Sequence, residues 1–189
     1  MIRIAIVGDI GSGKSHIAKL FDYPIFNADL EVAKIYKTNK QCFKGLKKKL
    51  PEYFSSFPIK KEEIIKAIVD SEKNLKKITK IVHPKIRKKL NIFLKNNKKE
   101  EAVILDIPLL LENKLNQKGD IIIFIQSKKT EVTKRLKKRN NFSLDLLNKF
   151  KKIQLSLSYK KKKSHFIIKN NFTNKSAKIN IQKILKKIL

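Results

Sequence analysis

The sequence is poor in several residue types, and these absences restrict the kinds of protein it can be. Of its 189 residues, one is cysteine (Cys42), none is tryptophan and five are glycine. A single cysteine excludes an internal disulfide framework and a cysteine-rich zinc site. No apolar run approaches the ~18 residues of a membrane span, and the first residues lack the layout of a signal peptide. We therefore expect a soluble, cytoplasmic protein.

Acidic residues are also scarce, so the chain carries a formal net charge of +30. Such a charge is typical of proteins that bind nucleic acid or an anionic membrane surface. However, 42 of the 46 basic residues are lysine, and only four are the arginine on which nucleic-acid readers rely. Lysine, asparagine and isoleucine share codons rich in A and U and together number 85 residues, so coding bias explains most of the lysine excess. We expect no membrane partner and no specific nucleic-acid partner.

Short apolar runs alternate with helical patterns along the chain. Runs that are apolar almost throughout are typical of strands buried on both faces of a parallel sheet. We expect five such strands, at 2–7, 24–27, 102–107, 120–125 and 165–168. Helical periodicity covers 14–21, 30–99, 130–152 and 177–189, and prolines 51, 58 and 84 are expected to interrupt the longest of these stretches. The sequence thus predicts an α/β fold with a parallel sheet.

The segment Gly8–Ser15 has the pattern G-x-x-x-x-G-K-[ST], with a strand before it and a helix after it. In such a loop the backbone N–H groups converge on phosphate oxygens, and the following helix adds its positive end. Lys14 is then expected to bridge the β- and γ-phosphates, and the Ser15 hydroxyl to bind Mg²⁺. The motif predicts nucleotide binding, but it leaves open whether phosphate is transferred to water or to an acceptor.

The sequence has no Asn-Lys-x-Asp guanine-reading segment, and a small P-loop protein with a helical insertion and a basic lid is typical of a small-molecule kinase. Two acidic residues stand at the ends of predicted strands, where such a kinase needs a carboxylate beside the acceptor hydroxyl. Asp29 follows the second strand, and from the residues alone it is equally a catalytic base or the N-cap of a helix that begins near Leu30. Asp106 closes the third strand, either as a ligand of Mg²⁺ or its water or as a simple strand terminator.

Two of the four arginines, Arg135 and Arg139, are spaced i, i+4 on a predicted basic helix and share one face. Their planar charged groups suit triphosphate oxygens and the transferring phosphoryl group. His83 precedes a proline, and Arg87 follows one helical turn later. A lone histidine is more often structural, but this pair could hold an anionic acceptor.

Taken together, these segments resemble the dephospho-coenzyme A kinase family, and the resemblance extends along nearly the whole length of the sequence. The order and approximate spacing of seven segments agree with those of the family. They are Gly8–Ser15, Asn27-Ala28-Asp29, Ile81–Pro84, Ile107–Glu112, the Lys134-Arg135 to Arg139 pattern, the Gln154 and Lys160 pair, and Ile168–Asn171. The family's P-L-L-x-E and D-A-D segments separate it from adenylate, shikimate and other small P-loop kinases, and this sequence has the first in full and the second as N-A-D.

The resemblance implies a P-loop kinase-like fold, with a five-stranded parallel sheet flanked by helices, a helical acceptor-binding insertion and a small helical lid. The expected parts are a nucleotide-binding core (1–30, 100–127 and 156–189), an acceptor-binding lobe (31–99) and a lid (128–155). The implied activity is ATP-dependent phosphorylation of the ribose 3′-hydroxyl of dephospho-coenzyme A, with Mg²⁺, by a monomer or weak oligomer.

Each candidate site residue then has an expected role. Asp29 becomes the catalytic base, assisted by Lys14 and Arg139 at the γ-phosphoryl group. The expected nucleotide-binding residues are Gly8, Gly11, Ser12, Gly13, Lys14, Ser15, His16, Arg135 and Arg139. The expected acceptor-binding residues are Asp29, His83, Arg87, Pro108, Leu109 and Leu110, and the expected metal ligands are Ser15 and Asp106.

The sequence departs from the family pattern at Asp9, His16 and Asn27, where glycine, threonine and aspartate are usual. Two other functions stay open: a P-loop kinase acting on a nucleoside monophosphate, and a P-loop protein that binds nucleic acid through the basic surface.

Overall fold

A computed structural model describes residues 1–138 and 143–189, which group into two compact units. The first unit comprises Met1–Asn27, the described residues of Leu94–Phe142, and Ile153–Leu189. The second comprises Ala28–Phe93 and Ser143–Lys152. One of the points where the chain passes from the first unit to the second falls between Asn27 and Ala28, so the candidate base Asp29 is the second residue of the second unit. The division into core, lobe and lid expected from the sequence stays a prediction.

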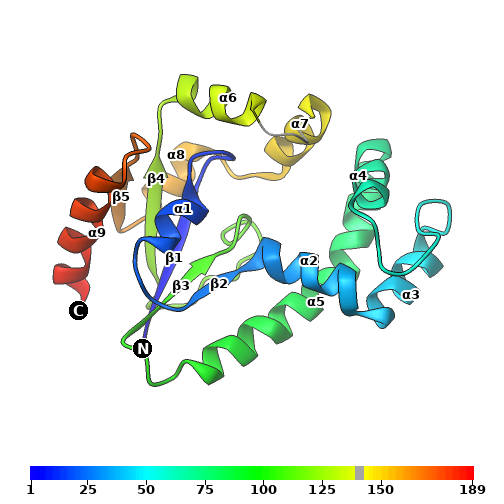
Figure 1. Ribbon diagram of the computed structural model, residues 1–189, viewed down its shortest axis with the longest axis horizontal. Coiled ribbons are helices and arrows are strands. Elements are labelled where there is room, and N and C mark those ends of the chain that lie inside the picture. The colour runs from blue at the N-terminus through cyan, green and yellow to red at the C-terminus, as the bar shows by residue number, and fades with distance from the viewer. Residues whose placement is uncertain (139–142) are drawn as a thin grey trace. The chain divides into compact units, whose positions relative to one another are not determined.

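The first unit contains a five-stranded, all-parallel sheet with the strand order β2-β3-β1-β4-β5 (Figure 1). The strands are β1 (Ile2–Gly8), β2 (Ile25–Asn27), β3 (Ala102–Asp106), β4 (Ile121–Gln126) and β5 (Phe166–Lys169). All five residues of β3 are buried, as expected for a strand covered on both faces. The five predicted strands are confirmed to within one residue at each end.

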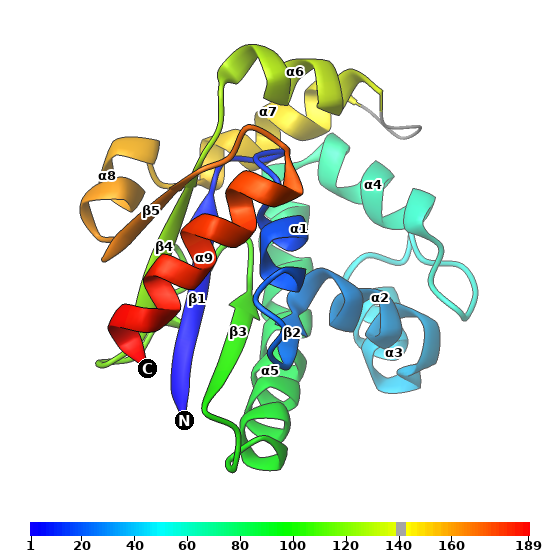
Figure 2. The same ribbon diagram turned by 60° about the vertical axis from the view of Figure 1, so that its left-hand side comes forward.

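Helices α1 (Lys14–Lys19) and α9 (Asn174–Ile188) lie along the same face of this sheet (Figure 2). Isoleucines that alternate along β1 and β4 meet Ile17 and Ala18 of α1 and Ala177 and Ile181 of α9 in one buried cluster. Helices α6 (Lys129–Lys137) and α8 (Leu157–Lys162) complete the unit. Because all the strands are parallel, their carboxyl ends meet at one edge of the sheet, where α/β proteins bind ligands.

The second unit is helical. It contains α2 (Ala28–Thr38), α3 (Lys40–Lys49), α4 (Lys61–Asp70), most of α5 (Glu72–Asn96) and α7 (Leu144–Ile153). Its buried side chains include Ile35, Leu46, Ile68 and Ile78. The long helical block between the second and third strands is confirmed. In the described residues, the predicted basic helical stretch at 130–152 forms α6 and α7.

The expected interruption at Pro84 is wrong, because α5 runs through it for 25 residues. Proline removes one backbone N–H donor and normally costs a helix about 3 kcal/mol. Here Val82 and Ile86, on either side of Pro84, are buried in the unit, and this packing offsets the lost hydrogen bond. Pro51 and Pro58 do lie between helices, after α3 and before α4. None of the described helices has the length and apolar content needed to cross a membrane.

Candidate active site

The loop between β1 and α1 folds tightly at the carboxyl edge of the sheet. The Ser12 N–H donates to the Asp9 carbonyl (3.2 Å), and the Ile10 N–H donates to the Asp9 carboxylate (2.7 Å). Lys14 Nζ donates back to the carbonyl oxygens of Asp9 (2.6 Å) and Gly8 (3.3 Å). The lysine therefore lies across the loop, and the unusual Asp9 takes part in the loop's own hydrogen bonds.

The loop glycines are needed because neighbouring side chains leave no room for a Cβ atom. A Cβ at Gly11 would lie 2.9 Å from Leu136 Cγ of α6. A Cβ at Gly13 would lie 2.5 Å from Asn170 Nδ2, and Gly13 also has a positive φ of 89°. Both distances are shorter than ordinary carbon contacts and both glycines have a positive φ, so another residue at either position would strain the backbone and displace the neighbouring side chain.

Two side chains that follow the neighbouring strands β4 and β5 bind the backbone of the loop. Ser127, just after β4, and Asn170, just after β5, both donate to the Ser12 carbonyl, at 2.9 and 2.8 Å. Asn170 belongs to one of the segments that resemble the family, but it was not among the candidate site residues. Nothing in the local sequence around Ser127 indicated its role, because the contact joins positions 115 residues apart.

This arrangement predicts a difference between two glycine-to-alanine variants. Gly119 has nearly the same φ (93°) as Gly13, but a Cβ there would meet nothing within 4 Å. The G119A substitution should lower the free energy of unfolding by about 1 kcal/mol, from backbone strain alone. G13A adds the collision with Asn170, so we expect a loss of about 2–4 kcal/mol together with weaker nucleotide binding. Chemical denaturation and nucleotide titration of both variants measure the two effects. Equal losses of stability in G13A and G119A would show that the Asn170 contact is unimportant.

Asp106 lies at the carboxyl end of β3 and is buried, with 2 % of the residue exposed. The Asn27 side chain, from the paired end of β2, donates to Asp106 Oδ2 at 2.6 Å. An aspartate at position 27 would place two carboxylates together and repel Asp106. The departure from the family pattern therefore gives Asp106 a hydrogen-bond donor on one oxygen, while the other oxygen can serve as a ligand for a cation.

Asp29 lies in the first turn of α2, which begins at Ala28. The alternative role as N-cap of a helix that begins near Leu30 is therefore wrong, since the helix starts two residues earlier. The residue is exposed, and its carboxylate stands near the positive end of the helix, which favours a negative charge. Asp29 follows Asn27 by two residues in the chain.

The basic residues expected to contact the nucleotide lie near the loop where the structure describes them. Arg135 of α6 stacks its guanidinium over the Phe172 ring, 4.3 Å from the ring centroid. Phe172 in turn lies beside Gly13. His16 Nε2 and Asn174 Oδ1 are 2.7 Å apart. Arg139 lies outside the described residues.

The expected acceptor-binding residues come from both units. Pro108 and Leu109 form a half-buried turn after β3, which the Leu110 N–H closes by donating to the Ile107 carbonyl (3.2 Å). The Leu110 side chain points into the core and is 1 % exposed, so it supports the turn from beneath. His83 and Arg87 lie one turn apart on α5 in the second unit.

The environment of His83 predicts a pH dependence of stability. Burial lowers the pKa of His83, and the positive charge of Arg87 lowers it further. The unfolded chain, with an ordinary histidine pKa of about 6.5, therefore takes up the proton first as the pH falls. The resulting stabilisation is complete above about pH 6.5 and is lost as the pH falls below it. Thermal unfolding between pH 7.5 and 5 should show a steeper decline for wild type than for His83→Gln; parallel curves would contradict this.

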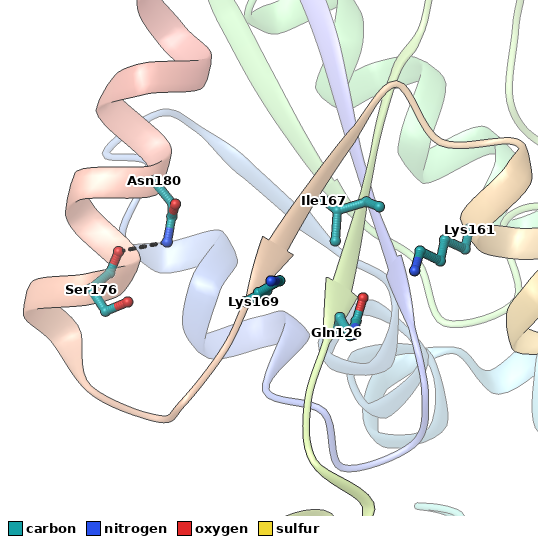
Figure 3. A pocket seen from close by; sticks show the side chains of 6 residues that line it. All are labelled: Gln126, Lys161, Ile167, Lys169, Ser176 and Asn180. Atoms are coloured by element: carbon teal, nitrogen blue, oxygen red, sulfur yellow. Dashed lines mark hydrogen bonds between the residues drawn. The ribbon is translucent and has the colours of Figure 1, made fainter.

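A hollow of about 610 Å³ lies at edge strand β5 (Figure 3). Asn180 on α9 donates to the Ser176 carbonyl at its rim (2.9 Å), and two lysines, Lys161 and Lys169, line it. None of the candidate site residues lines this hollow, so it contributes nothing to the site described above.

Comparison with known proteins shows the family to which the chain belongs. The sequence profile described as "Dephospho-CoA kinase" matches residues 2–176. The chain belongs to the dephospho-CoA kinase family. Members of this family are phosphotransferases, so the chain is a kinase, and the resemblance drawn from its motifs is confirmed. Neither alternative function is favoured by these matches.

Individual members of the dephospho-CoA kinase family match over most of their length. The protein of that name from Wolbachia pipientis wMel is 32 % identical over 170 residues, which cover 87 % of each chain. That from Bacillus anthracis is 30 % identical over 199 residues, covering 98 % of this chain and 96 % of its own.

Solved structures confirm the P-loop kinase-like fold. TT1252 from Thermus thermophilus has a TM-score of 0.78 and 24 % identity, covering 100 % of this chain and 98 % of its own. A dephospho-CoA kinase from Campylobacter jejuni has a TM-score of 0.61 and 24 % identity, and the match covers 98 % of this chain and 96 % of its own. Shikimate kinase from Acinetobacter baumannii, at 15 % identity and a TM-score of 0.54, shares the fold, covering 100 % of this chain and 93 % of its own.

Proposed function

We propose that this chain phosphorylates the ribose 3′-hydroxyl of dephospho-coenzyme A with ATP, the last step of coenzyme A biosynthesis. The observation that carries the proposal is the family match over residues 2–176 in a chain that retains both the nucleotide loop and Asp29. We extend the proposal to a cytoplasmic location and a monomeric or weakly associating state.

The loop supports binding of a triphosphate. Side chains are absent where the glycines line it, and Lys14 presents its ammonium group across the loop mouth. The buried Ser12 Oγ has no hydrogen-bond partner among the described residues, which is typical of an atom that a bound ligand satisfies. Lys14, His16, Arg135 and Arg139 are then the groups that offset the charge of the phosphates.

The residues present also fit a magnesium ion. Mg²⁺ prefers oxygen ligands and is usually held by one or two side chains together with substrate phosphates. Ser15 stands exposed at the start of α1, and Asp106 has one oxygen fixed by Asn27. Among the described residues, no three His, Cys, Asp or Glu side chains gather into a cation site, which suits an ion that depends on the nucleotide. When bound, the ion would neutralise charge on the phosphates.

Asp29 acts on the acceptor in this proposal. Its carboxylate accepts a hydrogen bond from the 3′-hydroxyl and takes up the proton as the oxygen–phosphorus bond forms and the bond to ADP breaks. His83 and Arg87 bind the anionic acceptor, while Pro108 and Leu109 offer it the surface of the turn. Arg139 stabilises the transferring phosphoryl group, and closure of the lid excludes water, which would otherwise receive that group.

An acceptor panel tests the proposal. ADP release is measured with dephospho-coenzyme A, AMP, CMP and shikimate, each with ATP and Mg²⁺. We expect dephospho-coenzyme A to be preferred by kcat/KM over each other acceptor by about a hundredfold or more. Preference for a nucleoside monophosphate would support the alternative kinase. Tight polynucleotide binding that depends on ATP and falls steeply with salt would support the nucleic-acid alternative.

A further inference from the structure

A buried charge pair in the first unit takes no part in the roles assigned so far. Lys160 of α8 and Glu112 form an ion pair (Nζ to Oε1, 2.8 Å), with only 1 % and 9 % of their side chains exposed. Lys160 Nζ also donates to Gln154 Oε1 at 3.3 Å. The backbone N–H of Leu155 donates to Glu112 Oε1 at 3.0 Å. We refer to Glu112, Gln154, Leu155 and Lys160 as the anchor cluster.

Burial of such a pair is costly. Removing a lysine and a glutamate from water carries a penalty that their attraction often fails to repay, so apolar residues of similar volume can be equally stable. A pair of this kind is therefore weak evidence of a contribution to stability. The pair can instead serve to fix two segments in one arrangement.

The two segments that the anchor cluster joins are far apart in sequence and both concern the reaction. Glu112 lies within the turn segment 108–114, which begins with Pro108 and Leu109 just after the strand that carries Asp106. Gln154 and Leu155 end the basic segment 128–155, where the chain returns to the sheet through α8 and β5. Glu112 thus ties the candidate acceptor turn to the returning end of the candidate lid.

We propose that Glu112 and Lys160 are positioning residues, which hold the 108–114 turn segment in the conformation that receives the acceptor. This inference rests on the function proposed above. Lys160 is too deeply buried to contact a substrate, so it acts through Glu112, and Glu112 acts through the turn. Loss of the link should weaken acceptor binding and leave nucleotide binding intact, because none of the hydrogen bonds described above for the Gly8–Ser15 loop involves the anchor cluster.

The experiment compares two matched double variants. E112Q/K160M removes both charges of the anchor cluster and keeps an amide oxygen to accept from Leu155. R3M/D120N does the same to another buried pair in this unit, Arg3 Nε to Asp120 Oδ1 (3.0 Å), and keeps an acceptor for the Gln117 N–H. Arg3 is the second residue of β1 and Asp120 precedes β4, so this pair lies at the opposite, amino edge of the sheet.

For E112Q/K160M we expect kcat/KM for dephospho-coenzyme A to fall about tenfold or more, mainly through KM, with KM for ATP within about twofold of wild type. R3M/D120N should leave both KM values within about twofold, whatever its effect on the unfolding midpoint. An acceptor KM equal in the two variants would overturn the inference, as would a parallel rise in both KM values of E112Q/K160M. If that variant does not fold, E112Q/K160Q replaces it, which also leaves no unpaired buried charge, with the same expected split. No coenzyme A from wild type would overturn the proposed function, and the inference with it.

Discussion

Replacement of Asp29 by asparagine should reduce kcat with dephospho-coenzyme A by about 10²–10⁴-fold, the usual contribution of a general base. The amide has nearly the same shape and can still meet the hydroxyl, but it cannot accept the proton. ATP affinity should stay within about twofold, because the substitution changes none of the glycines or the ammonium group of the Gly8–Ser15 loop. Steady-state kinetics and titration with a non-hydrolysable ATP analogue measure the two effects.

A matched control lies on the same helix. Glu31 is also in the first turn of α2, where it pairs with Lys34 (2.7 Å). E31Q removes one negative charge from that turn and should cost at most about 1 kcal/mol of stability with little effect on kcat. Turnover of Asp29→Asn at the wild-type rate, or an equal loss in E31Q, would show that Asp29 is not the base.

Replacement of Lys14 by methionine should lower kcat/KM for ATP by about 10²–10³-fold, comparable with loss of one preorganised donor to a developing negative charge. Methionine keeps the length of the side chain but removes the ammonium group that lies across the loop. Both the binding of the triphosphate and the stabilisation of the transferred group depend on that charge, so kcat and affinity should both fall. Nucleotide titration and single-turnover transfer separate the two effects.

Lys19→Met provides the control for this variant. Lys19 is an exposed lysine in the last turn of α1, the helix that Lys14 begins, so the substitution lowers the net charge equally. It should change kcat/KM by less than about twofold, since a surface lysine contributes little beyond general screening of charge. Similar losses in the two variants would mean that total charge, and not the place of Lys14 in the loop, determines nucleotide binding.

The parts of this protein that depend on local patterns were predictable from sequence. The apolar runs of β1, β3 and β4 identified buried strands, and the spacing of glycine, lysine and serine in Gly8–Ser15 identified the nucleotide loop. Both signals arise from residues adjacent in the chain, where periodicity and turn requirements are visible. The family followed from several such segments occurring in the right order.

Features that depend on tertiary contacts were not predictable. The pattern of α5 predicted a break at Pro84, because the burial of Val82 and Ile86 that sustains the helix is not visible locally. The sequence marked Asn27 only as a departure from the family pattern, because its hydrogen bond to Asp106 depends on the pairing of β2 with β3. Glu112 and Lys160 each matched a family segment, but their ion pair joins positions 48 residues apart in sequence, a distance no local pattern can bridge.

The central claim is that the Gly8–Ser15 loop delivers a phosphoryl group to an alcohol that Asp29 has prepared. Identification of the product tests it most directly: the purified protein is incubated with ATP, Mg²⁺ and dephospho-coenzyme A, and the mixture is analysed by mass spectrometry and ³¹P NMR. The account predicts one ADP for each coenzyme A, with the new phosphate on the ribose 3′-oxygen. Release of ADP and inorganic phosphate without coenzyme A, or phosphate at another position, would contradict it.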